Sequence, residues 1–320
     1  MQSDTQADYS AGYLLFARDT ALMAQPFNSR TGLLEGTPAP IGDQVLVDPG
    51  TWRLAASGTE GGLLAYVSGG AAANQLTWYD RAGKATSLAG KLLNLNHVRL
   101  SPDGSKVAAD LGESLSDIWL YDLRRGVSTR FTFGPSNSVA PVWSPDGRWI
   151  AYTLVERGHQ NIYRKPASGT GQAELLLEGD DKHVQNWPTD WSPDGGTLLF
   201  YTIGNLVSSA QLWELPLNNN DRKPTPLLPS GFLMMEARFS PDGRWIAYAS
   251  NESGRFEIYV IPASGTGGKW QISSSGGQQP LWRRDGKELF YLSSDDNLMS
   301  VPIKLRPDSV QADALIRCFR

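Results

Sequence analysis

A turn sequence that recurs at near-constant spacing is the feature that most constrains how this chain can fold. Ser-Pro-Asp-Gly occurs four times, ending at Gly104, Gly147, Gly195 and Gly243, and a divergent Arg-Arg-Asp-Gly ends at Gly286. The successive steps are 43, 48, 48 and 43 residues, and similar steps backwards reach Gly61 and then Gly12. This period is typical of one four-stranded blade of a β-propeller. The sequence therefore predicts an all-β propeller of seven blades, with six or eight as alternatives, formed by residues 1–320 as a single domain.

Each residue of the turn has a physical role. Proline presets φ, aspartate accepts hydrogen bonds from nearby backbone amides, and glycine adopts positive φ at little cost. A residue that recurs once per blade at a turn has a sufficient structural role, so we assign no catalytic role to Asp103, Asp146, Asp194, Asp242 and Asp285. Short aromatic and β-branched runs flank most copies, and they predict strands that are buried on both faces. We expect the residues just before four of the turns to be buried between blades: Trp143, Trp191, Phe239 and Trp282.

The two ends of the chain bear on how the repeats close. The first repeat lacks a clear innermost strand, and the last repeat lacks a clear outermost one. Residues 312–319 could supply one missing strand by pairing with the first blade. Residues 5–10 could supply the other, and its absence is the alternative. We therefore expect closing strands or frayed ends in residues 1–11 and 306–320, since an open propeller would leave strand edges exposed.

Composition excludes several classes of protein. With 33 acidic and 29 basic side chains the formal net charge is −4, which gives no electrostatic case for nucleic-acid binding. A single cysteine excludes an intramolecular disulfide framework, and three scattered histidines, His97, His159 and His183, predict no metal site and no cofactor. No apolar segment is long enough for a membrane helix, so we expect no membrane insertion by this chain. It would be cytoplasmic if complete, and extracytoplasmic if it belongs to a longer membrane-anchored protein.

Catalytic motifs are also missing from the sequence. No G-x-S-x-G nucleophile motif occurs, and its two near misses, residues 167–171 and 263–267, are interpreted as turns. The Gly-rich loop, V-A-I-K, H-R-D and D-F-G motifs of protein kinases do not occur either. We therefore assign no catalytic residue.

The best candidates for ligand binding are polar residues close to the start of each inner strand, because that end of a blade lines the mouth of a propeller channel. They are Asn96, His97, Arg99, Asn137, Asn186, Asp190, Glu236, Arg238 and Gln278. Amides combined with two arginines and two acids suit a small polar ligand or a peptide tail, although a channel that holds only water is an equal alternative. Trp187 could be an exposed aromatic in this mouth or a plug beneath it.

A catalytic alternative uses the same residues. In a propeller lyase or hydrolase, His97 would act with Asp190 or Glu236 across the channel. Clustering within about 10 Å, with a carboxylate–histidine hydrogen bond, would favour that alternative for the five residues His97, Arg99, Asp190, Glu236 and Arg238. A wide channel with the groups far apart would favour a binding module.

The repeat resembles a known family. Trp-Ser-Pro-Asp-Gly-x-x-Ile-Ala-Tyr, followed by an Ile-Tyr or Ile-Trp strand, is similar to the TolB-type, WD-repeat-like β-propeller repeat. Residues 12–18, 22–27, 129–132 and 282–291 further resemble the C-terminal propeller region of bacterial, acidobacterial-type serine/threonine protein kinases.

In that kinase family a kinase domain and a membrane-spanning linker precede the propeller. The resemblance implies a non-catalytic sensor or protein-interaction module, which we expect to be monomeric and to bind a protein or a small polar ligand. A propeller derived from a prolyl-peptidase-like hydrolase is a further alternative, and it leads to the same non-catalytic prediction.

Overall fold

The structure is a computed structural model of the 320-residue chain. It describes residues 8–10, 12–18, 21–42, 47–48, 53–54, 56–58, 64–66, 77–79, 84–88, 95–112, 115–156, 158–180, 185–204, 210–218, 221–229, 231–306 and 308–319. These residues form strands and turns, with no helix among them, so the prediction of an all-β chain is confirmed. The chain divides into two compact units, Met1–Asn74 and Gln75–Arg320. The assignment of residues 1–320 to one domain stays a prediction.

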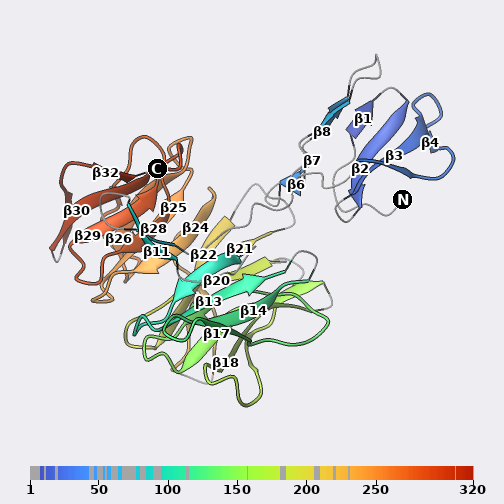
Figure 1. Cartoon of the computed structure of the whole chain (residues 1–320). Helices are drawn as coiled ribbons and strands as arrows, with labels where there is room; N and C mark the ends of the chain where they lie inside the picture. Colours follow the sequence, from blue (N-terminus) through green and yellow to red (C-terminus); the bar gives the residue numbers. More distant parts are fainter. Residues whose placement is uncertain are drawn as a thin grey trace. The chain divides into compact units, whose positions relative to one another are not determined.

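The second unit consists mainly of four-stranded antiparallel sheets in which consecutive strands are neighbours (Figure 1). The first sheet contains β12 (Leu95–Leu100), β13 (Lys106–Leu111), β14 (Asp117–Asp122) and β15 (Val127–Arg130). The second contains β16 (Ser138–Trp143), β17 (Trp149–Glu156), β18 (His159–Pro166) and β19 (Glu174–Leu177). The third contains β20 (Gln185–Trp191), β21 (Thr197–Ile203), β22 (Ala210–Pro216) and β23 (Thr225–Pro226). The next two are β24 (Met234–Phe239), β25 (Trp245–Ser250), β26 (Glu257–Pro262) and β27 (Trp270–Gln271); and β28 (Gln278–Trp282), β29 (Glu288–Leu292), β30 (Leu298–Arg306) and β31 (Ser309–Ala312), joined by β32 (Ile316–Phe319).

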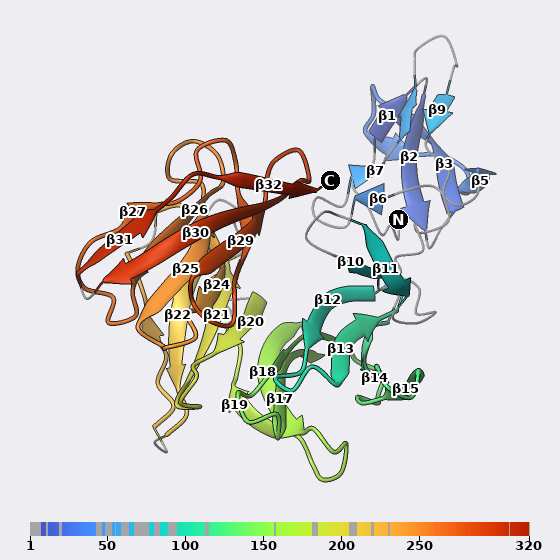
Figure 2. The same ribbon diagram turned by 60° about the vertical axis from the view of Figure 1, so that its left-hand side comes forward.

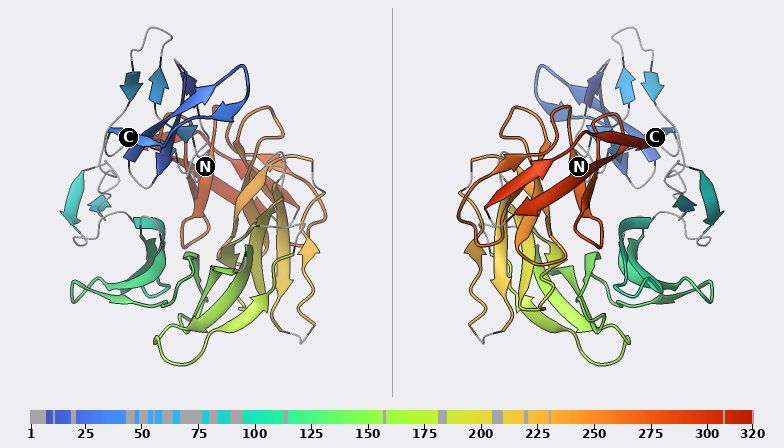
Figure 3. Two further views of the ribbon diagram at one scale, coloured as in Figure 1. Left: turned by 90° about the vertical axis from the view of Figure 1, so that its right-hand side faces the viewer. Right: turned by 90° about the vertical axis from the view of Figure 1, so that its left-hand side faces the viewer.

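The inner strands of consecutive sheets contact one another, β12 with β16, β16 with β20, β20 with β24 and β24 with β28. Figure 3 shows these sheets following each other in chain order, from green through yellow to red. This arrangement is that of consecutive propeller blades. A further strand pair, β10 (Thr77–Tyr79) with β11 (Ala85–Leu88), precedes them in the same unit.

The first unit contains one larger sheet and two strand pairs (Figure 2). The sheet is β1 (Asp8–Ser10), β2 (Tyr13–Arg18), β3 (Ala21–Asn28), β4 (Leu33–Leu34) and β5 (Ala39–Gly42), and the pairs are β6 (Val47–Asp48) with β7 (Arg53–Leu54) and β8 (Ala56–Gly58) with β9 (Leu64–Tyr66). Gly61 lies outside the described residues, so the count of seven blades stays a prediction.

The ends of the chain differ in part from expectation. Strand β1 pairs with β2, so residues 8–10 supply an inner strand to the first sheet as expected. The C-terminal strand β32 pairs with β30 of the last sheet, and not with the first blade. The nine-residue β30 explains this, because it is long enough to pair with β31 through Ile303–Arg306 and with β32 through Leu298–Ser300.

Apolar side chains fill the space between neighbouring sheets. Trp143, Trp191, Phe239 and Trp282 are only 6–8% exposed, which confirms the expected burial. Each belongs to a cluster that draws residues from two consecutive sheets; for Trp143 these include Ala108 and Ile118 of one sheet and Ile150 and Tyr152 of the next. Burial of this apolar surface is the main force that holds one sheet against another. Leu100, which occupies the matching position in β12, is 48% exposed.

The repeated turns have the expected local structure. In the turn that follows β16, the Ser144 hydroxyl donates to Asp146 Oδ1 at 2.6 Å, and Trp149 N–H donates to Ser144 Oγ at 2.9 Å. The hydroxyl bond, with the Arg148 N–H bond behind it, lowers the pKa of Asp146 to about 2. Gly147 has φ of 69°, a conformation that glycine adopts without a Cβ penalty. The aspartate carboxylate therefore stabilises its own turn.

Candidate functional site

A repeated irregularity re-aims side chains on the inner strands. All five inner strands of the second unit carry a register shift against the next strand. At four of these shifts a non-glycine residue has positive φ: His97 (44°), Ala140 (54°), Glu236 (59°) and Gln279 (55°). Each lies seven residues before its turn glycine, where β20 instead has Pro188, whose ring fixes φ at a negative value. Bulges of this kind redirect a side chain relative to the regular pleat, and here they redirect His97 and Glu236.

The position two residues after this one, five residues before the turn glycine, has a charged side chain in three of the five inner strands. These positions hold Arg99, Val142, Asp190, Arg238 and Leu281 in chain order. Arg238 Nη1 lies 3.8 Å from Asp190 Oδ1 and also donates a hydrogen bond to the Thr189 carbonyl. Asp190 Oδ2 in turn accepts the Phe239 N–H at 2.7 Å. Charged groups of β20 and β24 are thus joined directly.

Arg99 interacts with charges from several sheets. Burial, followed by the charge of Arg238, lowers the pKa of the Arg99 guanidinium to about 9, while Asp190 and Glu236 oppose the shift. The group therefore remains protonated at neutral pH. Its Nη1 donates to the Val98 carbonyl at 3.1 Å, but its Nε is buried and has no hydrogen-bond partner among the described residues. A buried donor without an acceptor costs free energy, so an acceptor supplied by a ligand would stabilise Arg99.

The two carboxylates near these arginines are harder to ionise than usual. Burial raises the pKa of Glu236, although the Gln279 N–H, which donates to Oε2 at 2.7 Å, and the charges of Arg238 and Arg99 oppose it. Burial likewise raises the pKa of Asp190, and the charge of Arg238 is the largest opposing effect. The Asp190 side chain keeps 25% of its surface exposed, so it lies deep in the fold and still reaches solvent.

His97 is oriented by a buried carboxylate. Its Nδ1 lies 2.9 Å from Asp110 Oδ1, and the same oxygen accepts the Ala140 N–H at 3.1 Å. Asp110 is 2% exposed, whereas the His97 side chain is 40% exposed. Because an ionised carboxylate only accepts, the Nδ1 carries the hydrogen and leaves Nε2 free to accept.

Aromatic rings adjoin this histidine. The centroid of the Trp187 ring lies 5.4 Å from that of His97, and Trp187 stacks on Tyr201 at 6.3 Å. Burial, together with the charge of Glu236, raises the pKa of Tyr201 well above its usual range. We call His97, Arg99, Asp190, Glu236 and Arg238, with Asp110, Trp187 and Tyr201 beside them, the inner-strand cluster.

Not all of the residues predicted for ligand binding belong to this cluster. Asn137 Oδ1 accepts the Ser116 N–H at 2.7 Å, and Asn186 Nδ2 donates to the Gln160 carbonyl at 2.7 Å. Both amides thus bond to backbone groups within the fold, Asn137 to the loop before β14 and Asn186 to β18. Asn96 and Gln278 are exposed on β12 and β28. Their role in binding stays a prediction.

Sequence reasoning missed two members of the cluster, Asp110 and Tyr201. Both lie six residues after a turn glycine, where the other repeats have Thr153, Ala249 and Leu292. A carboxylate or a phenol at a position that is otherwise small or apolar was the available signal. Comparing the repeats position by position would have found it.

The structure also bears on metals and membranes. Within the ranges described above, no group of three or more His, Cys, Asp or Glu side chains is placed to hold a metal ion. None of the described segments is a helix long and apolar enough to cross a membrane. His159 begins β18, and His183 lies outside the described residues.

Comparisons with known proteins agree with this architecture. Residues 56–212 match the model of the TolB beta propeller domain. TolB of the Tol-Pal system of Helicobacter pylori is 27% identical over 172 residues, which cover 51% of this chain and 38% of that protein. An uncharacterized protein of Agrobacterium fabrum is 27% identical over 157 residues, which cover 46% of this chain and 52% of its own. The chain thus spans about half, or less, of the length of these relatives.

Solved structures show the same fold. The crystal structure of TolB from Acinetobacter baumannii superposes with a TM-score of 0.59 at 19% identity, covering 92% of this chain and 76% of that chain. The five consecutive antiparallel sheets and the match of residues 56–212 to the TolB beta propeller domain thus agree on a β-propeller fold of the TolB type.

Proposed function

We propose that this protein is a non-catalytic binding module and that its ligand binds at the inner-strand cluster, at the mouth of the propeller channel. The observation that carries the proposal is Arg99, a charged donor whose buried Nε has no acceptor in the part of the chain that the structure describes. Arg238 adds a second guanidinium that already bonds to Thr189 and Asp190. Arg99 is therefore the group that gains most from a ligand.

The surroundings of Arg99 define the class of ligand. A carboxylate would satisfy the guanidinium through charge-assisted hydrogen bonds, which are the strongest type available in proteins. Trp187 and the half-exposed ring of His97, whose centroids lie 5.4 Å apart, offer flat aromatic surface in the same cluster. Glu236, which uses Oε2 for a backbone N–H, can accept from a donor on the same ligand. A peptide tail or a small polar molecule that carries a carboxylate fits this combination.

A peptide array tests the proposal. The probes are short peptides with a free C-terminal carboxylate, each compared with its C-terminal amide, and binding is measured by fluorescence anisotropy. Arg99→Gln should weaken binding of the best carboxylate peptide by about 10- to 100-fold, which corresponds to about 1.5–3 kcal/mol for a hydrogen bond to a charged group. Arg244→Gln is the control, because Arg244 is an exposed arginine that bonds Asp242 within its own turn. Unchanged binding by an Arg99→Ala, Arg238→Ala double variant would show that the site lies elsewhere.

An enzyme is the second candidate, and the His97–Asp110 pair is the observation that favours it. A histidine whose Nδ1 bonds to a buried carboxylate can act as a general base through Nε2. Among the described residues, however, no serine, threonine or cysteine side chain bonds to His97, and Asp110 also has a structural hydrogen bond to Ala140. Turnover of any substrate that disappears in His97→Ala would favour the enzyme over the binding module.

A finer proposal concerns the protein to which this propeller belongs. The similarity of residues 12–18, 22–27, 129–132 and 282–291 to receptor-like bacterial kinases supports a role as the extracytoplasmic sensor region of such a kinase. The reading frame upstream of the Met1 codon tests this. A kinase domain and a membrane helix in frame would support it, and an in-frame stop codon directly upstream would contradict it. An α/β-hydrolase domain in frame would instead support the prolyl-peptidase-like alternative.

A further inference from the structure

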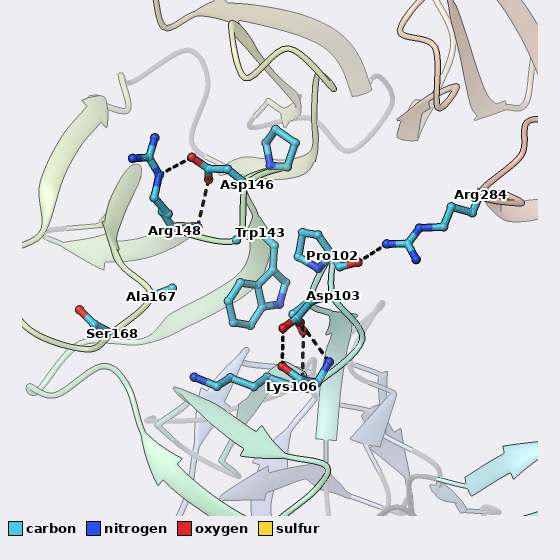
Figure 4. A pocket seen from close by; sticks show the side chains of 13 residues that line it. Pro102, Asp103, Lys106, Trp143, Asp146, Arg148, Ala167, Ser168 and Arg284 are labelled. Carbon is cyan, nitrogen blue, oxygen red and sulfur yellow. Dashed lines mark hydrogen bonds and ion pairs between the residues drawn. The ribbon is translucent and has the colours of Figure 1, made fainter.

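A cavity lies outside the inner-strand cluster, at the turns that follow β12 and β16. Its volume is about 760 Å³, within the range of ligand sites. Residues from three sheets line it, including Pro102, Lys106, Trp143, Arg148 and Arg284 (Figure 4). Figure 4 shows Trp143 between the turn that carries Asp103 and the turn that carries Asp146, with Arg284 reaching Pro102 from the last sheet.

The acidic residues of the cavity accept hydrogen bonds from groups of their own turns. Asp103 accepts the Ser101 hydroxyl at 2.7 Å, the Ser105 N–H at 3.0 Å and the Ser105 hydroxyl at 2.8 Å. Asp146 is bonded in the same way by Ser144 and by the N–H and Nε of Arg148. These carboxylates have little left to offer a cation in the cavity.

The basic residues of the cavity have fewer hydrogen-bond and ion-pair partners. Arg148 pairs with Asp146 and keeps 79% of its side chain exposed. Arg284 donates to the Pro102 carbonyl, and within the described part of the chain neither Arg284 nor Lys106 forms an ion pair. Asp122, which lies opposite Lys106 in the β13–β14 register, accepts the N–H groups of Arg124 and Arg125 and also attracts the charge of Lys106. The lining therefore has three basic side chains against the two carboxylates of Asp103 and Asp146, a small excess of positive charge.

Arg284 is also a departure from the repeat, because it stands where four turns have proline. The position of Lys106 varies between repeats, and the other repeats have Trp149, Thr197, Trp245 and Glu288 there. The turn tolerates Arg284 because its neighbour Arg283 bonds Glu288 at 3.0 Å and lies 3.5 Å from Asp285. Positions where a chain departs from its own structural rule are expected at functional sites.

We propose that this cavity binds an acidic segment of a partner protein. Lys106, Arg148 and Arg284 would contact its carboxylates, and guanidinium groups bind carboxylates with two parallel hydrogen bonds. Pro102, Pro145 and the Trp143 ring form an apolar wall. This wall would contact the aliphatic parts of glutamate side chains, whereas inorganic phosphate has no apolar group to contact it. The site is separate from the one in the proposed function, and its test does not depend on Arg99.

Labelled hexaglutamate is the probe, with hexaglutamine as the uncharged control, and binding to the full chain is measured by fluorescence anisotropy. The double variant Lys106→Gln, Arg284→Gln should weaken hexaglutamate binding at least about tenfold. Its matched control is Arg244→Gln, Lys287→Gln, which removes the same charge from exposed turn positions outside the cavity and should leave binding within about twofold. Equal weakening in both variants, or no binding to the unmodified protein, would overturn the proposal.

Two further measurements keep the test decisive. The charge-reversed variant Lys106→Glu, Arg284→Glu should lose hexaglutamate binding and gain hexalysine binding, a gain that misfolding cannot produce. Tripolyphosphate should compete poorly with hexaglutamate. If it competes equally well and depends on the same two residues, the cavity binds anions in general and the acidic-segment proposal is wrong.

Discussion

Replacing Trp143 with alanine tests whether contacts between sheets hold this propeller together. The indole is 8% exposed and lies in a cluster with Ile118 of the preceding sheet and Ile150 of its own. Deleting a buried aromatic of this kind costs about 3–5 kcal/mol. The indole N–H also donates to the Arg99 carbonyl at 3.1 Å, a hydrogen bond whose net contribution is about 1 kcal/mol of that total.

Urea denaturation followed by far-UV circular dichroism measures the loss. Trp143→Phe separates the two contributions, because it keeps most of the apolar surface and removes the hydrogen bond, and we expect it to cost about 1–2 kcal/mol. Phe133→Ala is the control for an exposed aromatic, since Phe133 is 71% exposed, and it should cost less than about 1 kcal/mol. A Trp143→Ala loss below about 1 kcal/mol, at an unchanged denaturant slope, would refute the assignment of Trp143 to the inter-sheet core.

Three other predictions concern the turn, the bulge and activity. The pKa of Asp146 is lowered to about 2, chiefly by the Ser144 hydroxyl, so its stabilising effect is present above about pH 4 and is lost as the pH falls towards 2; thermal melts of Asp146→Asn should therefore converge with the unmodified protein in acid, and a constant difference at every pH would contradict this. Gln279→Gly should raise the free energy of unfolding by about 1 kcal/mol, because Gln279 has φ of 55°, whereas Gln278→Gly in regular strand should lower it by about 0.5–1 kcal/mol in the same urea experiment. Assays for phosphotransfer, peptidase and esterase activity should show no turnover, and turnover that is abolished by His97→Ala would count against the binding module.

The fold could be predicted because its signals are local and repeated. The turn requires proline, aspartate and glycine at fixed offsets, and each copy with its apolar neighbours predicts two strands without knowledge of the rest of the chain. The end of the chain was harder to predict, because β32 was free to pair with either of two sheets. The pairing of β32 depends on the length of β30, because β31 pairs only with Ile303–Arg306 and leaves the rest of the nine-residue strand for β32.

The site could be predicted only in part. Polar residues near the inner strands were identifiable by position, and the structure brings His97, Arg99, Asp190, Glu236 and Arg238 into one electrostatic cluster. The carboxylate that bonds to His97, however, is Asp110 on β13, which was not among the residues singled out from the sequence. That contact depends on the bulge at His97, since φ of 44° there is not encoded by a glycine or any other turn residue. Backbone irregularity within a strand leaves a weak trace in a single sequence.

The repeats themselves explain why both proposed sites contain unusual residues. A blade needs its turn aspartate and its inter-sheet aromatic, so these positions vary little between repeats. The inner-strand positions five and seven residues before each glycine have no such requirement, and they range from Val142 and Ala140 to Arg99 and Glu236. At the turns, Arg284 replaces a proline that the four other copies have, and the position of Lys106 also varies between repeats. The propeller fold does not require charged side chains at these positions, and burying a charge costs desolvation free energy. Arg99, Asp190 and Glu236 are buried and carry this cost. Ligands that offset this cost provide a physical reason for such residues to occur there.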